Sequence, residues 1–97
     1  MTTTRTVATP VQLFDDERVR VTRLEFPPGA ETGWHRHEYD YVIVATSDCE
    51  MLVEEKDGST RTATVLHGEA YRRSAGVEHN VINNGEGRMV FIEVELK

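Results

Sequence analysis

Turn residues recur so often along this 97-residue chain that it reads as a series of short strands, without a convincing amphipathic helix. Lys56-Asp57-Gly58 predicts a hairpin, because Asp-Gly suits turns that need a positive φ. Closely spaced strands without helices favour a jelly-roll barrel or a sandwich. The predicted strands are 11–14, 19–26, 39–46, 50–55, 59–66, 70–73 and 88–96.

The length of the chain fits one domain with one modest core. Residues 1–10 are rich in Thr and end at Pro10, so we expect either a loose arm or an extra edge strand there. Residues 11–97 are expected to form the barrel. The predicted core includes one residue or more from most of the later strands: Met51, Val53, Val65, Val81 and Phe91.

Two predicted strands have unusual apolar patterns. In 19–26 the apolar residues change phase between Val21 and Leu24, which predicts a bulge near Thr22-Arg23 or a strand buried on both faces. In 88–96 one face carries Val90, Ile92, Val94 and Leu96, and Met89 and Phe91 make the first half of the other face apolar too. Such a strand fits burial between sheets or in an interface, and we predict a homodimer.

Three histidines provide the strongest indication of chemistry. His35 and His37 are two residues apart, so in a strand they project from the same face, and His79 lies far along the chain. Neutral imidazole is the commonest protein ligand for Zn, Fe, Ni and Cu, and a facial set of three leaves room for water or substrate. The histidines therefore predict a divalent transition metal, with Fe favoured for an oxygenase and Zn, Ni or Mn as alternatives.

The spacing around these histidines resembles the paired motifs of the cupin superfamily, Gly-x5-His-x-His-x3-Glu and Gly-x5-Pro-x-Gly-x2-His-x3-Asn. Here they begin at Gly29 and Gly68, and the resemblance covers about residues 27–83. It implies an all-β, single-domain cupin jelly roll, a double-stranded β-helix barrel. Two positions depart from the motifs, because Tyr41 stands where the family has glutamate and Ser74 where it has proline.

The change at position 41 alters the charge of the centre, since three neutral imidazoles bring no negative charge to the metal. Tyr41 could ligate as a phenolate, donate a hydrogen bond to a metal-bound water, or fill space. In an enzyme, Tyr41 or Tyr71 would supply a proton or a hydrogen bond.

Arg73 is the candidate substrate-binding residue. In the strand 70–73, alternation places Tyr71 and Arg73 on one face, which by analogy with the family points into the barrel. There the guanidinium would suit a small carboxylate. The alternative is that Arg73 pairs with a glutamate such as Glu93, or points to solvent.

Three functions remain open from the residues alone: a metal-dependent enzyme, a non-catalytic metal- or metabolite-binding module, and a structural relic of the fold. Three-histidine cupins include dioxygenases, and the same ligands would serve a metal-dependent isomerase or lyase. The segments 37–42 and 76–83 resemble short bacterial cupins such as the β-alanine degradation proteins, which implies a small amino or carboxylic acid.

Charge and composition narrow the partners. A net charge of −6 argues against nucleic acid, and no apolar run approaches the roughly 20 residues of a membrane span. The first residues lack the apolar region of a signal peptide, and the single cysteine, Cys49, fits a reducing compartment. We therefore expect a cytoplasmic protein that binds a small molecule.

Overall fold

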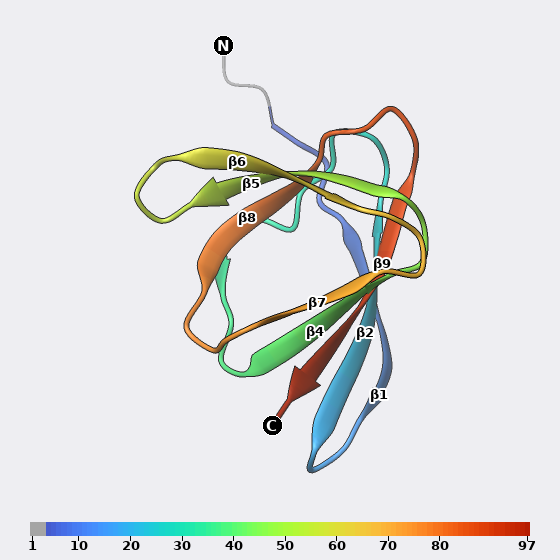
Figure 1. Ribbon diagram of the computed structural model, residues 1–97, viewed down its shortest axis with the longest axis vertical. Coiled ribbons are helices and arrows are strands. Elements are labelled where there is room, and N and C mark those ends of the chain that lie inside the picture. The colour runs from blue at the N-terminus through green and yellow to red at the C-terminus, as the bar shows by residue number, and fades with distance from the viewer. Residues whose placement is uncertain (1–3) are drawn as a thin grey trace.

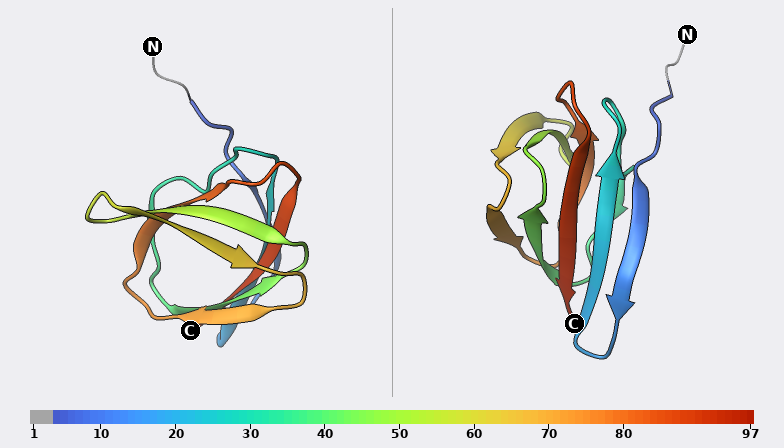
Figure 2. Two further views of the ribbon diagram at one scale, coloured as in Figure 1. Left: turned by 45° about the horizontal axis from the view of Figure 1, so that its top comes forward. Right: turned by 90° about the vertical axis from the view of Figure 1, so that its right-hand side faces the viewer.

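The computed structural model describes residues 4–97, and within that range nine strands form two antiparallel sheets that face each other (Figures 1 and 2). One sheet has the order β1-β2-β9-β4-β7 and the other β3-β8-β5-β6. The strands are β1 (Thr9–Asp15), β2 (Val19–Phe26), β3 (His35–Arg36), β4 (Asp40–Ala45), β5 (Cys49–Glu55), β6 (Thr60–Val65), β7 (Ala70–Arg73), β8 (Glu78–Asn83) and β9 (Met89–Leu96).

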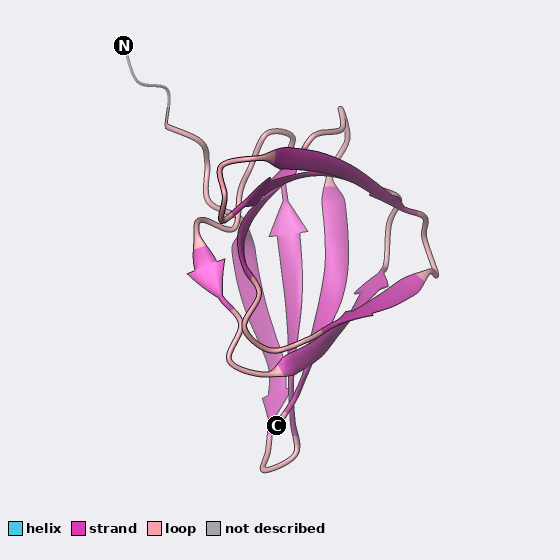
Figure 3. Ribbon diagram, turned by 60° about the vertical axis from the view of Figure 1, so that its left-hand side comes forward, coloured by secondary structure: helices cyan, strands magenta, loops and turns pink. Residues whose placement is uncertain are grey.

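No helix occurs between residues 4 and 97, in agreement with the all-β prediction (Figure 3). It follows that this part of the chain holds no helix long and apolar enough to cross a membrane. The hairpin predicted at Lys56-Asp57-Gly58 joins β5 to β6, and Gly58 has the expected positive φ of 88°.

The core lies between the sheets. Phe26 and Phe91 face each other with ring centroids 5.3 Å apart, and both are almost fully buried. Burying a side chain of this size stabilises the fold by about 1.5–3 kcal/mol. All five residues predicted for the core are buried: Met51, Val53, Val65, Val81 and Phe91.

Asn83 fixes the loops at the end of the barrel away from the histidines. Its Nδ2 donates to the carbonyl oxygens of Phe26, Pro27 and Gly87, and its Oδ1 accepts a hydrogen bond from the backbone N–H of Gly85. The side chain is buried, and these bonds satisfy it. It is a structural residue of the turns.

The irregularity in the first sheet is not where the pattern placed it. The register of β2 against β9 runs without interruption from Val19 to Phe26, and the bulge lies in β1, between Gln12 and Phe14. The apolar residues of β2 change phase because its two ends bury different faces: Val21 lies on the outward face, opposite Val94, and Phe26 on the inward face, opposite Met89. The bulge expected near Thr22-Arg23 was wrong, and Val21 alone is buried on the outward face, so the alternative of a strand buried on both faces holds only in part.

The N-terminal segment runs beside the loop between β2 and β3. The N–H of Ala8 donates to the carbonyl of Glu31, whose own N–H donates to the carbonyl of Thr6. The strand β1 then begins at Thr9. Part of the arm expected at residues 1–10 lies outside the described residues.

Candidate metal centre

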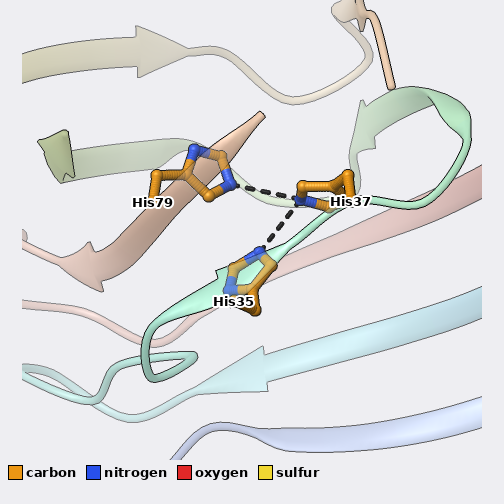
Figure 4. Close-up of side chains that lie close together, drawn as sticks. All are labelled: His35, His37 and His79. Carbon is orange, nitrogen blue, oxygen red and sulfur yellow. Dashed lines mark hydrogen bonds between the residues drawn. The ribbon is translucent and has the colours of Figure 1, made fainter. Parts of the chain in front are cut away.

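Strand pairing brings the three histidines together. His35 in β3 and His79 in β8 are direct partners across the antiparallel ladder, and partners share a face. His37 follows two residues after His35, and its backbone continues the ladder through bonds to Val77 and Gly76. Figure 4 shows the three rings turned toward a common point between the sheets.

The three Nε2 atoms converge. The Nε2 of His37 lies 2.9 Å from that of His35 and 3.2 Å from that of His79. The Nδ1 of His35 is 2.9 Å from the carbonyl oxygen of Gly33. Because a carbonyl oxygen only accepts, that Nδ1 carries the hydrogen, and the Nε2 of the neutral ring then presents a lone pair.

This arrangement fits a metal ion. Two nitrogens that each bind a metal at about 2.1 Å stand about 3.0 Å apart when they meet at a right angle, and about 3.4 Å apart in a tetrahedron. The ligand atoms of all three histidines lie within 4.8 Å of one another. A hydrogen on the Nε2 of His37 could bond to only one of the two neighbouring Nε2 atoms, whereas a cation would attract the lone pairs of all three Nε2 atoms.

The electrostatics keep His37 and His79 neutral. Burial, followed by the nearby His35, His79 and Arg73, lowers the pKa of His37 to about 3. Burial, followed by His35 and Arg73, lowers the pKa of His79 to about 4. A metal therefore meets little competition from protons at neutral pH, since imidazole ligates in its neutral form.

Tyr41 forms one wall of the centre. Its ring stacks on that of His37 with centroids 3.7 Å apart, and its buried hydroxyl has no hydrogen-bond partner within residues 4–97. Burial raises the pKa of Tyr41, which works against the phenolate reading. The hydroxyl borders the same cavity as the three histidines, as the hydrogen-bonding reading requires.

A second cavity of about 150 Å³ adjoins the histidines and contains Arg73. Arg73 is the backbone partner of Tyr41 and points inward with Tyr71, while Arg72 points outward to Asp40. In the described chain no carboxylate lies within ion-pair distance of Arg73, so the expected alternative of a pair with Glu93 does not occur. His79 lines this cavity too.

Glu93 is the residue that sequence reasoning assigned no role in the centre. Its carboxylate lies 3.9 Å from the Nδ1 of His37, and its side chain is only 17% exposed. Burial, assisted by Glu95, raises the pKa of Glu93 to about 7. The sequence did contain a signal for Glu93. It lies on the same face of the last strand as Met89 and Phe91, which predict that this face is the inner one.

A larger cavity, about 580 Å³, lies elsewhere. It lies among the loops near Asn83 and Arg88 and is lined largely by polar and acidic side chains such as Asp48 and Glu86. None of the histidines borders it. The chemistry of the centre therefore belongs to the smaller cavities between the sheets.

The comparisons with known proteins agree with this architecture. The chain is 48% identical over 93 residues to the β-alanine degradation protein BauB of Pseudomonas aeruginosa. The aligned residues cover 96% of this chain and 97% of the relative. A cupin domain from Bordetella pertussis superposes with a TM-score of 0.94 at 46% identity, and 99% of each chain is covered.

A more distant structure shares the fold alone. A Klebsiella pneumoniae protein with a double-stranded β-helix domain superposes with a TM-score of 0.78 at 17% identity, over 98% of this chain and 81% of that one. The family model described as the cupin domain matches residues 22–95, which include every histidine of the cluster. The chain belongs to the cupin family.

Proposed function

We propose that this protein is a metal-dependent, oxygenase-like enzyme that acts on a small carboxylic or amino acid between the two sheets. The observation that carries the proposal is the position of Arg73, an inward cation without an acidic partner, on the cavity that His79 also lines. A guanidinium recognises a carboxylate through two parallel hydrogen bonds. Metal centre and anion site are therefore neighbours.

The size of this cavity limits the substrate. A volume of about 150 Å³ accommodates a molecule the size of benzene, about six heavy atoms. The relative named for β-alanine degradation supports the same class, because β-alanine is a short amino acid with one carboxylate. We therefore favour three- to four-carbon acids, a range that follows from about six heavy atoms.

The residues divide the work by their positions. His35, His37 and His79 would hold the metal, which when bound supplies Lewis acidity and, in the case of Fe(II), the capacity to activate oxygen. Arg73 would orient the substrate carboxylate. Tyr71, whose hydroxyl within residues 4–97 donates only a long hydrogen bond of 4.0 Å to the sulfur of Met51, would donate a hydrogen bond to the substrate.

Tyr41, the neighbour of Arg73 across the strand pair, would act on the cavity that the three histidines line. Its unpartnered hydroxyl can donate a hydrogen bond to a group held by the histidines. An isomerase or a lyase would use the same residues with Zn, Ni or Mn as the Lewis acid.

The second candidate is a non-catalytic cupin that binds a metal or a metabolite. It is favoured by the small volume of the cavities and by the short loops, which leave little chain to close over a substrate. In that case Arg73 and the histidines would bind the ligand without turnover.

Metal analysis of anaerobically purified protein, followed by oxygen uptake with short acids including β-alanine, separates these functions. Stoichiometric iron and acid-dependent oxygen uptake are expected. Tight zinc without turnover would favour the binding protein, and protein that takes up no metal under any condition would refute the metal-dependent enzyme and favour a structural relic of the fold.

The anion site has a matched pair of variants. Arg73→Gln removes the inward guanidinium, and we expect the KM for the acid to rise at least about 10-fold, in line with 1.5–3 kcal/mol for a charge-assisted bond. Arg72→Gln removes the outward guanidinium of the same strand and should leave KM unchanged. Equal KM values in both variants would refute the role of Arg73.

The homodimer and the cytoplasmic location stay predictions. The outward face of the sheet that contains β9 presents Val90, Ile92, Val94 and Leu96, all partly exposed in one copy of the chain. A second copy packed on this face would cover them. A monomer in light scattering at micromolar concentration would contradict the dimer.

A further inference from the structure

Among the carboxylates at the histidine end of the barrel, Glu93 differs from its neighbours. Glu95, two residues along the same strand and face, pairs with Arg20 at 3.5 Å, and Glu55 pairs with Arg61 at 2.6 Å. Glu93 has no Lys or Arg within 4 Å anywhere in residues 4–97, and His37 is the group it approaches. A carboxylate buried in this way is stabilised in its charged form by a nearby positive charge, and without one it takes up a proton more readily.

The side of His37 away from Glu93 is where a cation would bind. Its Nε2 faces two other imidazoles, at 2.9 and 3.2 Å, so three ring nitrogens converge there. A metal ion at that point would provide the positive charge that Glu93 lacks.

The geometry also places Glu93 on the side of His37 opposite to the metal position. The Nε2 of His37 points to the other two histidines, and its Nδ1 points to the Oε1 of Glu93 at 3.9 Å. That distance is an electrostatic contact, longer than a direct hydrogen bond and short enough for a single water to bridge. It favours the tautomer with hydrogen on Nδ1 and the lone pair on Nε2.

We propose that Glu93 supplies, from behind His37, a negative charge for the metal. The glutamate of the family motif would bring such a charge, and Tyr41, which stands at that motif position, does not. Glu93 is a positioning residue in this role: it orients His37, fixes its tautomer and makes the ring a better donor, without binding the metal. The inference rests on the proposed metal centre but is independent of whether the protein is catalytic.

Glu93→Gln tests this, because it keeps the shape of the side chain and removes the charge. The control is Glu95→Gln, the same change two residues along the same face. Affinities for Zn²⁺ and Co²⁺ would be measured on the full chain by competition with a chromophoric chelator. We expect Glu93→Gln to weaken both about 10- to 100-fold and Glu95→Gln to change them by less than about twofold.

Two further readouts exclude a merely structural role. The metal-free Glu93→Gln protein should melt at or above the wild-type temperature, because an unpaired buried carboxylate is removed. The visible bands of bound Co²⁺ should keep their position, because Glu93 is not a ligand. A lower melting temperature would assign Glu93 to stability, and shifted bands would make it a direct ligand; either would overturn the proposal.

The failures are distinguishable. Wild-type affinity in Glu93→Gln would overturn the role of Glu93 and leave the metal centre intact. Wild-type protein that binds neither ion would overturn the metal centre and this inference together.

Discussion

The two ends of the barrel interior are built by the same strands but differ in chemistry. On the inner face of β9, Met89 and Phe91 are almost fully buried, and Glu93 and Glu95 follow at the other end. β8 changes likewise from Val81 to His79 along its inward face. Each strand therefore contributes to an apolar end and to a polar end.

The difference separates stability from function. The apolar end is closed by apolar side chains and by Asn83, whose side-chain nitrogen and oxygen are both hydrogen-bonded, whereas the polar end leaves the hydroxyl of Tyr41 and the Nδ1 of His79 buried without a hydrogen-bond partner in the described chain. Unsatisfied polar groups cost free energy, so a fold retains them where they serve binding or catalysis. The variants below test this division.

His37→Ala should have the largest effect of these variants, and the effect should be on metal binding rather than on stability. We expect metal content to fall from one ion per chain to below detection, because two remaining imidazoles do not form a facial site. Stability in the presence of a chelator should change little or rise, since a cluster of converging lone pairs is relieved. Elemental analysis and thermal melts would measure both. Unchanged metal content would refute the ligand assignment.

Phe91→Ala is the counterpart at the apolar end. It removes a ring that packs against Phe26, and we expect a loss of about 3–5 kcal/mol in the free energy of unfolding. The metal affinity of the folded fraction should stay within a few-fold of wild type. Urea denaturation with chelator gives the first quantity, and titration well below the melting temperature gives the second. A large loss of affinity in a stable Phe91→Ala protein would contradict the division of the barrel.

The sequence predicts the apolar end better than the polar end. Strands such as 70–73 and core residues such as Val53 follow from alternation and turn residues, which are local properties. β8 was not predicted as a strand, because His79, Asn80 and Asn83 lower its β propensity, yet pairing with β3 and β5 overrides that preference.

The histidines could be found because ligand spacing leaves a motif in the sequence. The contact between Glu93 and His37 leaves none, because it joins residues 56 positions apart, by subtraction of their numbers, through the curvature of two sheets. Met89 and Phe91 indicate that Glu93 lies on the inner face of the last strand, but not which side chain it meets there. Only the three-dimensional arrangement places Glu93 on the cavity that the histidines line.

The polar end should also make stability depend on pH. The pKa values of His37 and His79 fall from 6.5 to about 3 and about 4 on folding, so between pH 6.5 and 4.5 the unfolded chain binds more protons at these sites, about one more at pH 6.5 and about two more near pH 5.5. The pKa of Glu93 rises from 4.5 to about 7, so the folded chain binds one more there. The metal-free protein should therefore lose stability as the pH falls, by about 1.4 kcal/mol per unit for one net proton.

Two variants sharpen this expectation. Glu93→Gln removes the opposing proton and should about double the slope, while Phe91→Ala should lower stability equally at each pH and keep the wild-type slope. Urea denaturation with chelator at several pH values across this window would measure all three proteins. Stability that is flat or rises toward pH 4.5 would contradict the assignment of neutral, buried imidazoles.

Tyr41→Phe should have the smallest effect and distinguishes the readings of that residue. Without metal, loss of a hydroxyl that has no partner should leave stability unchanged or raise it by up to about 1 kcal/mol.

The ring would still stack on His37, so a space-filling role predicts wild-type metal affinity and wild-type turnover. A hydrogen bond to a group at the metal predicts wild-type affinity with reduced kcat, and a phenolate ligand predicts weakened affinity and loss of any charge-transfer band of the ferric protein. Because burial raises the pKa of Tyr41, we expect the affinity to be kept. The value of kcat then decides whether the hydroxyl acts in the reaction or the ring only completes the wall of the centre.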